Sequence, residues 1–488
     1  MSRPGLREGA FSVIGGLIDD MLRAAEDARD TVSEALFEPT LRLGVTGLSR
    51  AGKTVFITSL VANMLERGRL TRLSAQRDGR IESVALRPQP DRDVPRFDFE
   101  GHMAALSGPQ PRWPSSTRSI SQLRLSIRYR PGGWLSGLSG PSTLHLDIVD
   151  YPGEWLLDLA MMALDFDAWS AQALTAAQGP LRARHAGDWL AQVAARDLAA
   201  PFDEGAAQAL ATAYAGYLHA CRRDGLSGLT PGRFLMPGAL EGSPALTFCP
   251  LPPAPSARRG SLRAEFARRY DAYVAQVVKP FFRDHFARID RQVVLVDLLG
   301  ALDAGPGAVA DLRAAMAQVL ACFRPGANDW LSALLGRRLD RVLFAATKAD
   351  HVHHDQHPRM TAILKALMRE SVERSQFRGA RVEALALASL RATVEQEIAR
   401  DGRLLPCVRG RLLDTGREAA LFPGDLPTDP QRVLAEAVEG AARDAHWLGG
   451  DLSVMAFAPP PSSGRPGDGP PNIRLDQALE FLIGDKLA

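Results

Sequence analysis

The chain has 488 residues, of which 46% are hydrophobic and 23% are charged, with a formal net charge of +2. This length is too great for one compact core, so we expect two or three domains. The near-neutral charge argues against a nucleic-acid partner. No apolar stretch is long enough to span a bilayer, and the sparse cysteines have neither metal nor disulfide spacing, which favours a cytoplasmic protein.

Residues 1–38 are predicted to form an N-terminal amphipathic helix. Apolar side chains from Phe11 to Leu36 recur at helical spacing, and the opposite face is acidic. An acidic face has the wrong sign for an anionic membrane surface. We therefore expect this helix to pack on the body of the protein or on a partner.

Gly47-Leu-Ser-Arg-Ala-Gly-Lys-Thr54 matches the phosphate-loop pattern G-x-x-x-x-G-K-[ST], between an apolar run at 41–45 and helical spacing at 55–65. Phosphates would lie on a helix N-terminus, with Lys53 reaching the β and γ phosphates and the Thr54 hydroxyl binding Mg²⁺. The sequence therefore predicts a nucleoside triphosphate site. The predicted nucleotide contacts in this loop are Gly47, Ser49, Arg50, Ala51, Gly52, Lys53, Thr54 and Val55.

Arg50 lies inside this loop and allows two interpretations. Its guanidinium could stand beside the bridging phosphate oxygens as an internal arginine finger, which would make it catalytic. The preferred alternative is a solvated side chain that pairs with a nearby carboxylate.

Apolar alternation at 120–130 predicts a half-buried strand, after a strand at 81–86 and a loop rich in proline and arginine. The hydroxyls of Trp113-Pro-Ser-Ser-Thr117 precede that strand. Thr117 is the preferred further Mg²⁺ ligand, because it lies nearest the strand. Ser115 and Ser116 are close rivals, and an ordinary polar loop is the other alternative.

The strand at 144–150 ends in Asp150-Tyr-Pro-Gly153, which Glu154 follows. Asp150 is predicted to hold Mg²⁺, the Gly153 N–H to sense the γ phosphate, and Glu154 to orient the attacking water. Asp297-Leu-Leu-Gly300 also fits Asp-x-x-Gly at a strand end. Asp150 is preferred because it follows the alternating strand and because Glu154 comes next.

Residues 155–288 are alanine-rich and helical, and apolar strand signals resume at 293–297, 342–346 and 382–387. Such runs separated by helices predict an α/β fold with a mostly parallel sheet, helices on both faces and a large inserted helical domain. A Pro/Gly/Ser stretch at 459–471 precedes a final amphipathic helix. The predicted units are the N-terminal helix at 1–38, the two parts of the α/β core at 39–154 and 289–458, the inserted helical domain at 155–288, and a linker with the C-terminal helix at 459–488.

Thr347-Lys348-Ala349-Asp350 follows the strand at 342–346. The Asp350 carboxylate would accept two hydrogen bonds that guanine offers and adenine does not, while the Lys348 stem covers one face of the base. A plain Lys-Asp helix start is the alternative. Backbone groups at Ser389 and Leu390 could cover the other face, although a loop without a role is equally compatible.

Histidines gather behind Asp350 and raise the question of a metal site. No thiolate or carboxylate pattern completes such a site, and a polar loop that begins a helix is the preferred interpretation. The four residues are His351, His353, His354 and His357.

The chain resembles the YcjX-like family of bacterial stress-associated P-loop proteins, on the residues 47–54, 113–129, 145–154, 294–302 and 347–351. The resemblance implies a Ras-like GTP-binding core interrupted by a helical domain, with GTP or GDP and Mg²⁺ as ligands. It also implies a cytoplasmic factor linked to envelope stress, working beside a membrane protein. Glu154 stands where many GTPases keep a glutamine, and Thr347 replaces the usual asparagine.

We therefore expect a slow Mg²⁺-dependent GTPase that acts as a nucleotide-controlled switch, with Lys53, Arg50 and Glu154 in catalytic roles. Its partners would be a guanine nucleotide and an unidentified protein, and a membrane protein would place it peripherally at the inner membrane. The alternative is an interaction scaffold that binds nucleotide and barely hydrolyses it. An ATP-dependent kinase is disfavoured by Asp350.

Overall fold

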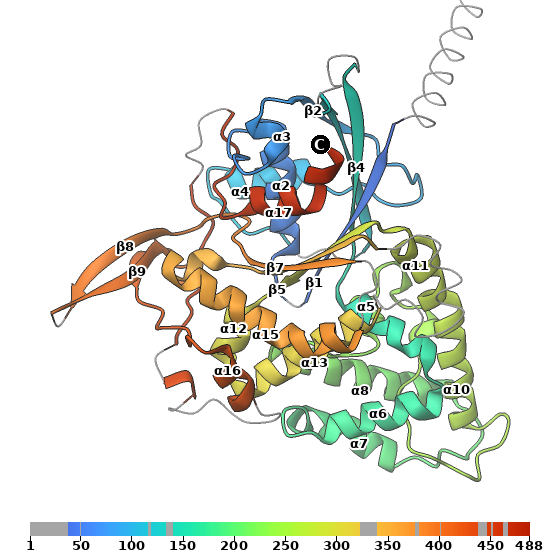
Figure 1. Ribbon diagram of the computed structural model, residues 1–488. Coiled ribbons are helices and arrows are strands. Elements are labelled where there is room, and N and C mark those ends of the chain that lie inside the picture. Colours follow the sequence, from blue (N-terminus) through green and yellow to red (C-terminus); the bar gives the residue numbers. More distant parts are fainter. Residues whose placement is uncertain are drawn as a thin grey trace, which may run out of the picture.

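The computed structural model in Figure 1 describes residues 38–48, 50–115, 119–132, 140–322, 339–375, 380–400, 402–437, 447–449, 452–461 and 467–488. The predicted N-terminal helix, Ser49, Ser116 and Thr117 lie outside the described residues.

The described residues form a central sheet in the order β2-β3-β4-β1-β5-β6-β7. Five neighbouring strands from β4 to β7 are parallel, and β3 alone runs against the others. The predicted α/β fold with a mostly parallel sheet is confirmed. The strands are β1 (Thr40–Gly47), β2 (Ile81–Arg87), β3 (Ser121–Tyr129), β4 (Ser142–Asp150), β5 (Arg291–Val296), β6 (Arg341–Ala346) and β7 (Arg381–Ala386).

Strand β3 differs from the half-buried strand that its alternation predicts. Its polar residues Gln122 and Ser126 are also buried. They can be buried because each has a hydrogen-bond partner: the Gln122 amide donates to Asp91 at 2.7 Å, and the Ser126 hydroxyl lies 2.8 Å from His145 Nδ1. Both faces of β3 are therefore largely covered, and only Arg128 is exposed.

Helices cover both faces of the sheet (Figure 1). Apolar residues of β1, β3 and β4 form one core with α2 (Lys53–Glu66), α3 (Ser74–Arg77), α4 (Phe99–Ser107) and α17 (Leu475–Ile483). The second core lies on the other face and involves α12 (Leu298–Ala304), α13 (Pro306–Cys322), α15 (His357–Ser375) and α16 (Pro430–Glu436).

The C-terminal helix α17 belongs to the first of these cores. Leu475, Leu479 and Leu482 are fully buried there. The guanidinium of Arg291, with a side-chain exposure of 0%, forms ion pairs with Asp485 at 2.5 Å and with Asp340 at 2.7 Å. A buried guanidinium needs such partners, so the end of the chain is fastened to the beginning of β5.

The helical insertion occupies the connection from β4 to β5. Its buried aromatic side chains contact one another, as in the Trp189–Tyr214 pair with ring centroids 4.7 Å apart. The same apolar cluster continues into α13 and the sheet, so the insertion packs on the core. Its helices are α5 (Glu154–Asp158), α6 (Phe166–Gln178), α7 (Ala183–Ala194), α8 (Glu204–Arg223), α9 (Gly232–Leu235), α10 (Leu262–Tyr273) and α11 (Lys279–Asp284).

A second, three-stranded sheet was not predicted from the sequence. It consists of β8 (Val394–Arg400), β9 (Arg403–Arg411) and β10 (Glu418–Leu421), and Figure 1 shows the β8–β9 hairpin reaching away from the body. Strand β8 is largely exposed and carries charge on both faces, so the period-2 apolar signal of a strand is absent. Among the helices described, none has the length and apolarity that crossing a bilayer requires.

Candidate functional site

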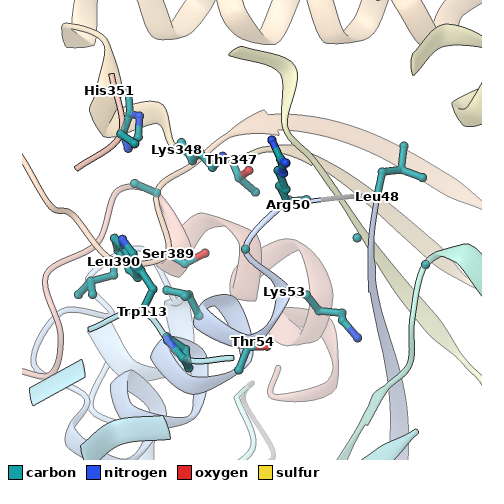
Figure 2. Close-up of a pocket in the computed structure, with 18 of the residues that line it drawn as sticks. Leu48, Arg50, Lys53, Thr54, Trp113, Thr347, Lys348, His351, Ser389 and Leu390 are labelled. Atoms are coloured by element: carbon teal, nitrogen blue, oxygen red, sulfur yellow. The ribbon is translucent and has the colours of Figure 1, made fainter. Parts of the chain in front are cut away.

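A cavity of about 450 Å³ lies where the carboxyl ends of the parallel strands meet (Figure 2). Ligands of α/β proteins bind at this edge. Asp150 is not in the wall of the cavity, and Ser49 and Thr117 fall outside the described residues. The predicted residues that line it are Gly47, Arg50, Ala51, Gly52, Lys53, Thr54, Val55, Gly153, Glu154, Thr347, Lys348, Asp350, Ser389 and Leu390.

The phosphate loop turns into α2 through a left-handed residue. Gly52 has φ of 77° and stands immediately before Lys53, the first residue of the helix. A side chain at this φ would be strained, which accounts for glycine here. The first N–H groups of α2 are thereby presented to the cavity as an anion-binding end.

Lys53 and Asp150 form a buried ion pair, with Nζ 2.6 Å from Oδ1 and side-chain exposures of 12% and 1%. The Ser121 hydroxyl also lies 3.5 Å from the other Asp150 oxygen. Thr54, which is 6% exposed, follows Lys53 directly. Hard oxygen donors of this kind suit Mg²⁺, so the Thr54 hydroxyl and the Asp150 carboxylate are a chemically fitting donor set.

The segment after β4 lies directly on the phosphate loop. A Cβ placed on Gly153 would come within 2.2 Å of the Gly47 carbonyl oxygen, so only glycine allows this approach. The next residue, Glu154, begins α5 and forms an ion pair with Arg222 of α8, with Oε1 2.9 Å from the guanidinium. Glu154 is therefore held by the insertion at the edge of the cavity.

The insertion supplies part of the cavity wall, through Arg222 and Met236. Arg50 of the phosphate loop donates to the carbonyl oxygen of Arg223, 3.2 Å away, and no carboxylate among the described residues pairs with it. The Trp155 indole donates to the Met236 carbonyl oxygen at 3.0 Å. The sequence did not reveal Arg222 or Met236, because neither belongs to a motif and both are distant from the loop in sequence.

The backbones of α5 and α9 touch at Gly232. A Cβ there would lie 2.2 Å from the Glu154 carbonyl oxygen. We expect Gly232→Ala to destabilise the protein by about 1–3 kcal/mol, because the backbones must separate. Chemical denaturation measures the free energy of unfolding of this variant. Gly216→Ala in α8 is the control, because an added Cβ there meets nothing within 4 Å. Equal stabilities of the two variants would contradict this contact.

Asp158 at the end of α5 is buried beneath the same junction. Its two oxygens accept hydrogen bonds of 2.6 Å from the Gly232 N–H and the Tyr273 hydroxyl. Burial raises the pKa of this carboxyl from 3.8 to about 6, against the lowering effect of Tyr273, Gly232 and Arg233. The folded state therefore holds the proton more tightly than the unfolded chain does.

This raised pKa gives Asp158 a definite effect on stability. Between pH about 4 and about 6 the folded protein keeps a proton that the unfolded chain loses, so stability falls by about 3 kcal/mol as pH rises through this window. We expect Asp158→Asn to match the wild type at pH 4 and to exceed it at pH 8. Urea denaturation at both pH values checks the difference, and a constant difference would contradict the assignment.

The residues after β6 lie on the side of the cavity predicted for the base. The Thr347 hydroxyl donates to the Val296 carbonyl oxygen at 3.3 Å, so it braces β5 rather than the phosphate loop. The Lys348 ammonium pairs with Asp297, which also caps α12 through the Gly300 N–H at 3.1 Å. Asp297 therefore acts as a helix cap beside the site.

Asp350 is 4% exposed, and its Oδ2 accepts a hydrogen bond from the Ala392 N–H at 2.7 Å. The Thr393 hydroxyl donates to the Asp350 carbonyl oxygen. The carboxylate is therefore oriented by the segment that leads into β8. A group held in this way is suited to specific recognition of a base edge.

An apolar wall that was not predicted closes this end of the cavity. The Trp113 indole donates to the Phe457 carbonyl oxygen at 2.8 Å, and His351 meets the Phe457 ring edge-on with centroids 5.1 Å apart. Burial lowers the pKa of His351, which favours its neutral form. Leu413, which is 52% exposed, stands at the rim. Only the isolated tryptophan in a polar loop could have signalled this wall.

Comparison with known proteins identifies the family of this chain. A model of the YcjX-like family, DUF463, matches residues 41–487. The Ras-like GTPase YcjX of Escherichia coli (strain K12) is 40% identical over 460 residues, which cover 92% of this chain and 96% of that protein. The Ras-like GTPase YcjX of Shewanella oneidensis is 36% identical over 496 residues, covering 97% of this chain and 100% of that protein. The chain belongs to the YcjX-like family.

Proposed function

We propose that this protein binds GTP in the cavity and hydrolyses it slowly to GDP and phosphate, as a nucleotide-controlled switch. The observation that carries the proposal is the meeting of the phosphate loop, the segment after β4 and the segment after β6 around one cavity. The names of two relatives, both Ras-like GTPases, support it.

Guanine would be selected at Asp350. Its carboxylate accepts the N1–H and the exocyclic amine of guanine, whereas adenine would leave the buried carboxylate facing a lone pair. The aliphatic stem of Lys348 would lie along one face of the base. Backbone groups of Ser389 and Leu390 would line the other side, and Trp113 with Phe457 would exclude water from the rim.

The triphosphate would lie on the phosphate loop and the N-terminus of α2. Lys53 would exchange its contact with Asp150 for the β and γ phosphates, and the freed Asp150 carboxylate would hold Mg²⁺ together with Thr54. When bound, Mg²⁺ neutralises charge on the phosphate oxygens. Gly153 would donate its N–H toward the γ phosphate.

Hydrolysis would depend on residues from both the core and the insertion. Glu154 would orient water, and the guanidinium of Arg222 holds Glu154 in place from α8. Arg222 and Arg50 both line the cavity, so either guanidinium can stabilise charge that develops on the transferring phosphoryl group. Catalysis would consist of positioning and electrostatic stabilisation.

The switch would act through the junction with the insertion. Glu154 is fixed to the insertion by Arg222 and by the close approach of Gly232. A displacement of Gly153 after the γ phosphate departs would therefore be passed to α8 and α9.

We further propose a cytoplasmic role in the envelope stress response, with a protein partner that distinguishes the two nucleotide states. Affinity capture in the GTP and GDP states tests for this partner.

Single-turnover phosphate release from GTP tests the proposed hydrolysis. We expect Arg222→Ala to slow the release about 100-fold, because Glu154 loses its anchor and the cavity loses a cation. Arg184→Ala is the matched control, because this arginine of the insertion is 60% exposed and pairs with Asp224 away from the cavity. Tight GTP binding with no release above the Lys53→Ala background would favour the scaffold alternative.

A further inference from the structure

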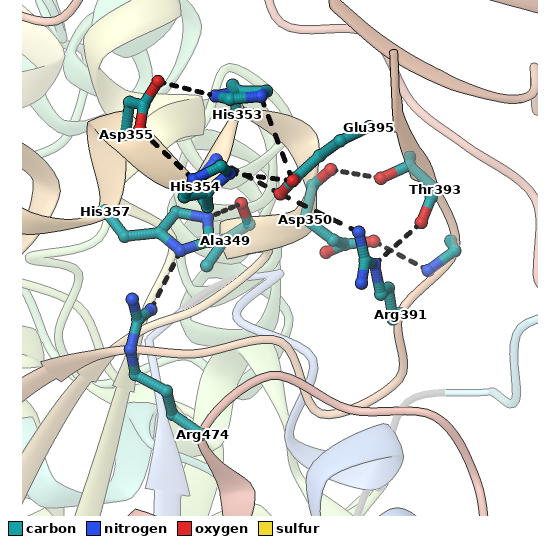
Figure 3. Close-up of polar contacts among 11 residues, drawn as sticks. Ala349, Asp350, His353, His354, Asp355, His357, Arg391, Thr393, Glu395 and Arg474 are labelled. Atoms are coloured by element: carbon teal, nitrogen blue, oxygen red, sulfur yellow. Dashed lines mark hydrogen bonds and ion pairs between the residues drawn. The ribbon is translucent and has the colours of Figure 1, made fainter.

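Three metal-ligating side chains converge outside the nucleotide cavity, on the loop between Asp350 and α15. His353, His354 and Asp355 each offer a ligand atom, and these atoms all lie within 4.8 Å of one another. The two rings lie 4.3 Å apart between centroids. Figure 3 shows the Asp355 carboxylate bridging the two imidazoles.

The contacts of this cluster place ring nitrogens of both histidines against carboxylate oxygens. His353 Nδ1 lies 3.2 Å from one Asp355 oxygen, and His354 Nε2 lies 3.2 Å from the other. The His353 side chain is 8% exposed, and its Nδ1 has no hydrogen-bond partner. An imidazole lone pair facing a carboxylate at this distance is repelled unless a proton or a metal ion stands between them.

Glu395 at the start of β8 contacts both histidines. Its Oε2 lies 2.8 Å from His354 Nδ1 and 3.9 Å from His353 Nε2, on the ring nitrogens that face away from Asp355. A carboxylate that accepts the N–H of one ring nitrogen leaves the lone pair on the other nitrogen, which is the usual support of a metal-bound histidine. Glu395 therefore orients His354 Nε2 toward Asp355.

We propose that His353, His354 and Asp355 bind a divalent transition-metal ion of the zinc class. Nitrogen and carboxylate ligands at about 2.0–2.2 Å from Zn²⁺ stand roughly 3.3 Å apart in a tetrahedral site. His353 Nδ1 lies 3.2 Å from one Asp355 oxygen, and His354 Nε2 lies 3.2 Å from the other, so the carboxylate can meet the ion with both oxygens. His354 and Asp355 are 61% and 70% exposed, so the ion has a path from solvent and room for a water ligand.

The metal site would fasten the loop that carries Asp350 to the second, three-stranded sheet. Ala392 and Thr393 already hold Asp350 from the segment before β8, and Glu395 lies two residues further along. An ion on His353 and His354 would tighten the same junction through Glu395. Resting on the proposed function, we expect guanine nucleotide to bind more tightly to the metal-loaded protein.

Calorimetric titration of Zn²⁺ into the full chain, prepared without a polyhistidine tag and dialysed against chelator, tests the site with no nucleotide present. We expect one saturable equivalent. The exposed substitutions Asp355→Asn and His354→Gln should each weaken binding at least about tenfold. His185→Gln is the control, because this histidine pairs with Asp224 elsewhere on the surface, at 2.8 Å, and should bind Zn²⁺ as the wild type does.

The absence of saturable Zn²⁺ binding would overturn the proposal, as would wild-type affinity in Asp355→Asn. Binding lost equally in His185→Gln would show adventitious surface chelation and would also overturn it. A parallel GDP titration separates this site from the proposed function. Stoichiometric Zn²⁺ binding without GDP binding would leave the metal site standing and refute guanine recognition.

Discussion

Replacing Lys53 with alanine should abolish nucleotide binding, lowering the affinity for GTP and GDP at least about 1,000-fold. The compact ammonium belongs to the first residue of α2, the helix end that would receive the phosphates, and arginine is not an equivalent replacement for it. Its removal also leaves Asp150, which is 1% exposed, without its ion-pair partner at 2.6 Å. An uncompensated carboxylate beside the phosphate loop repels phosphate.

Equilibrium titration with a fluorescent GDP analogue measures the effect. Lys365→Ala is the matched control, because Lys365 is 58% exposed and pairs with Glu383 at 3.2 Å on the surface. The double variant Lys53→Ala with Asp150→Asn removes the unpaired charge, so its melting temperature should recover while binding stays lost. Wild-type affinity in Lys53→Ala would contradict the proposed phosphate site.

Asp350→Asn should invert base preference from guanine to xanthine. Asparagine offers one acceptor and one donor, and xanthine carries a carbonyl where guanine carries the exocyclic amine. The Ala392 N–H at 2.7 Å can still donate to the amide oxygen, so the loop should keep its conformation. Loss of hydrogen bonds to a buried charge predicts GTP binding weaker by about 1,000-fold.

Competition of GTP, XTP and ATP for the fluorescent analogue checks the inversion. Asp425→Asn serves as the control. Asp425 is 69% exposed and forms a surface ion pair with Arg359, with 3.4 Å between the charged groups. Unchanged preference for GTP in Asp350→Asn would show that the base is recognised elsewhere.

Local sequence signals were sufficient for the sheet and for the positions of the motifs. The phosphate loop, the segment at Asp150 and the segment at Asp350 each follow a strand, and parallel strands bring their carboxyl ends to one edge. Strands were correctly placed at 144–150, 293–297 and 342–346. These features depend on residues near one another in the chain.

Contacts between distant segments could not be predicted in this way. Arg222 of α8 meets Glu154 of α5 where α9 packs against both helices, and Trp113 meets Phe457 across 344 positions of sequence. The histidine cluster was interpreted as a polar loop although Asp355 adjoins it in the sequence, and its other carboxylate contact, Glu395, comes from β8, a strand without apolar periodicity. The roles of the predicted site residues remain predictions.

Calorimetric titration of GDP, GTP and ATP into the full chain with Mg²⁺ tests most directly whether the three segments form one guanine nucleotide site. We predict one equivalent of GDP or GTP per chain and no measurable heat with ATP. Comparable binding of ATP, or no heat with either guanine nucleotide, would contradict the claim that these segments form a guanine nucleotide site.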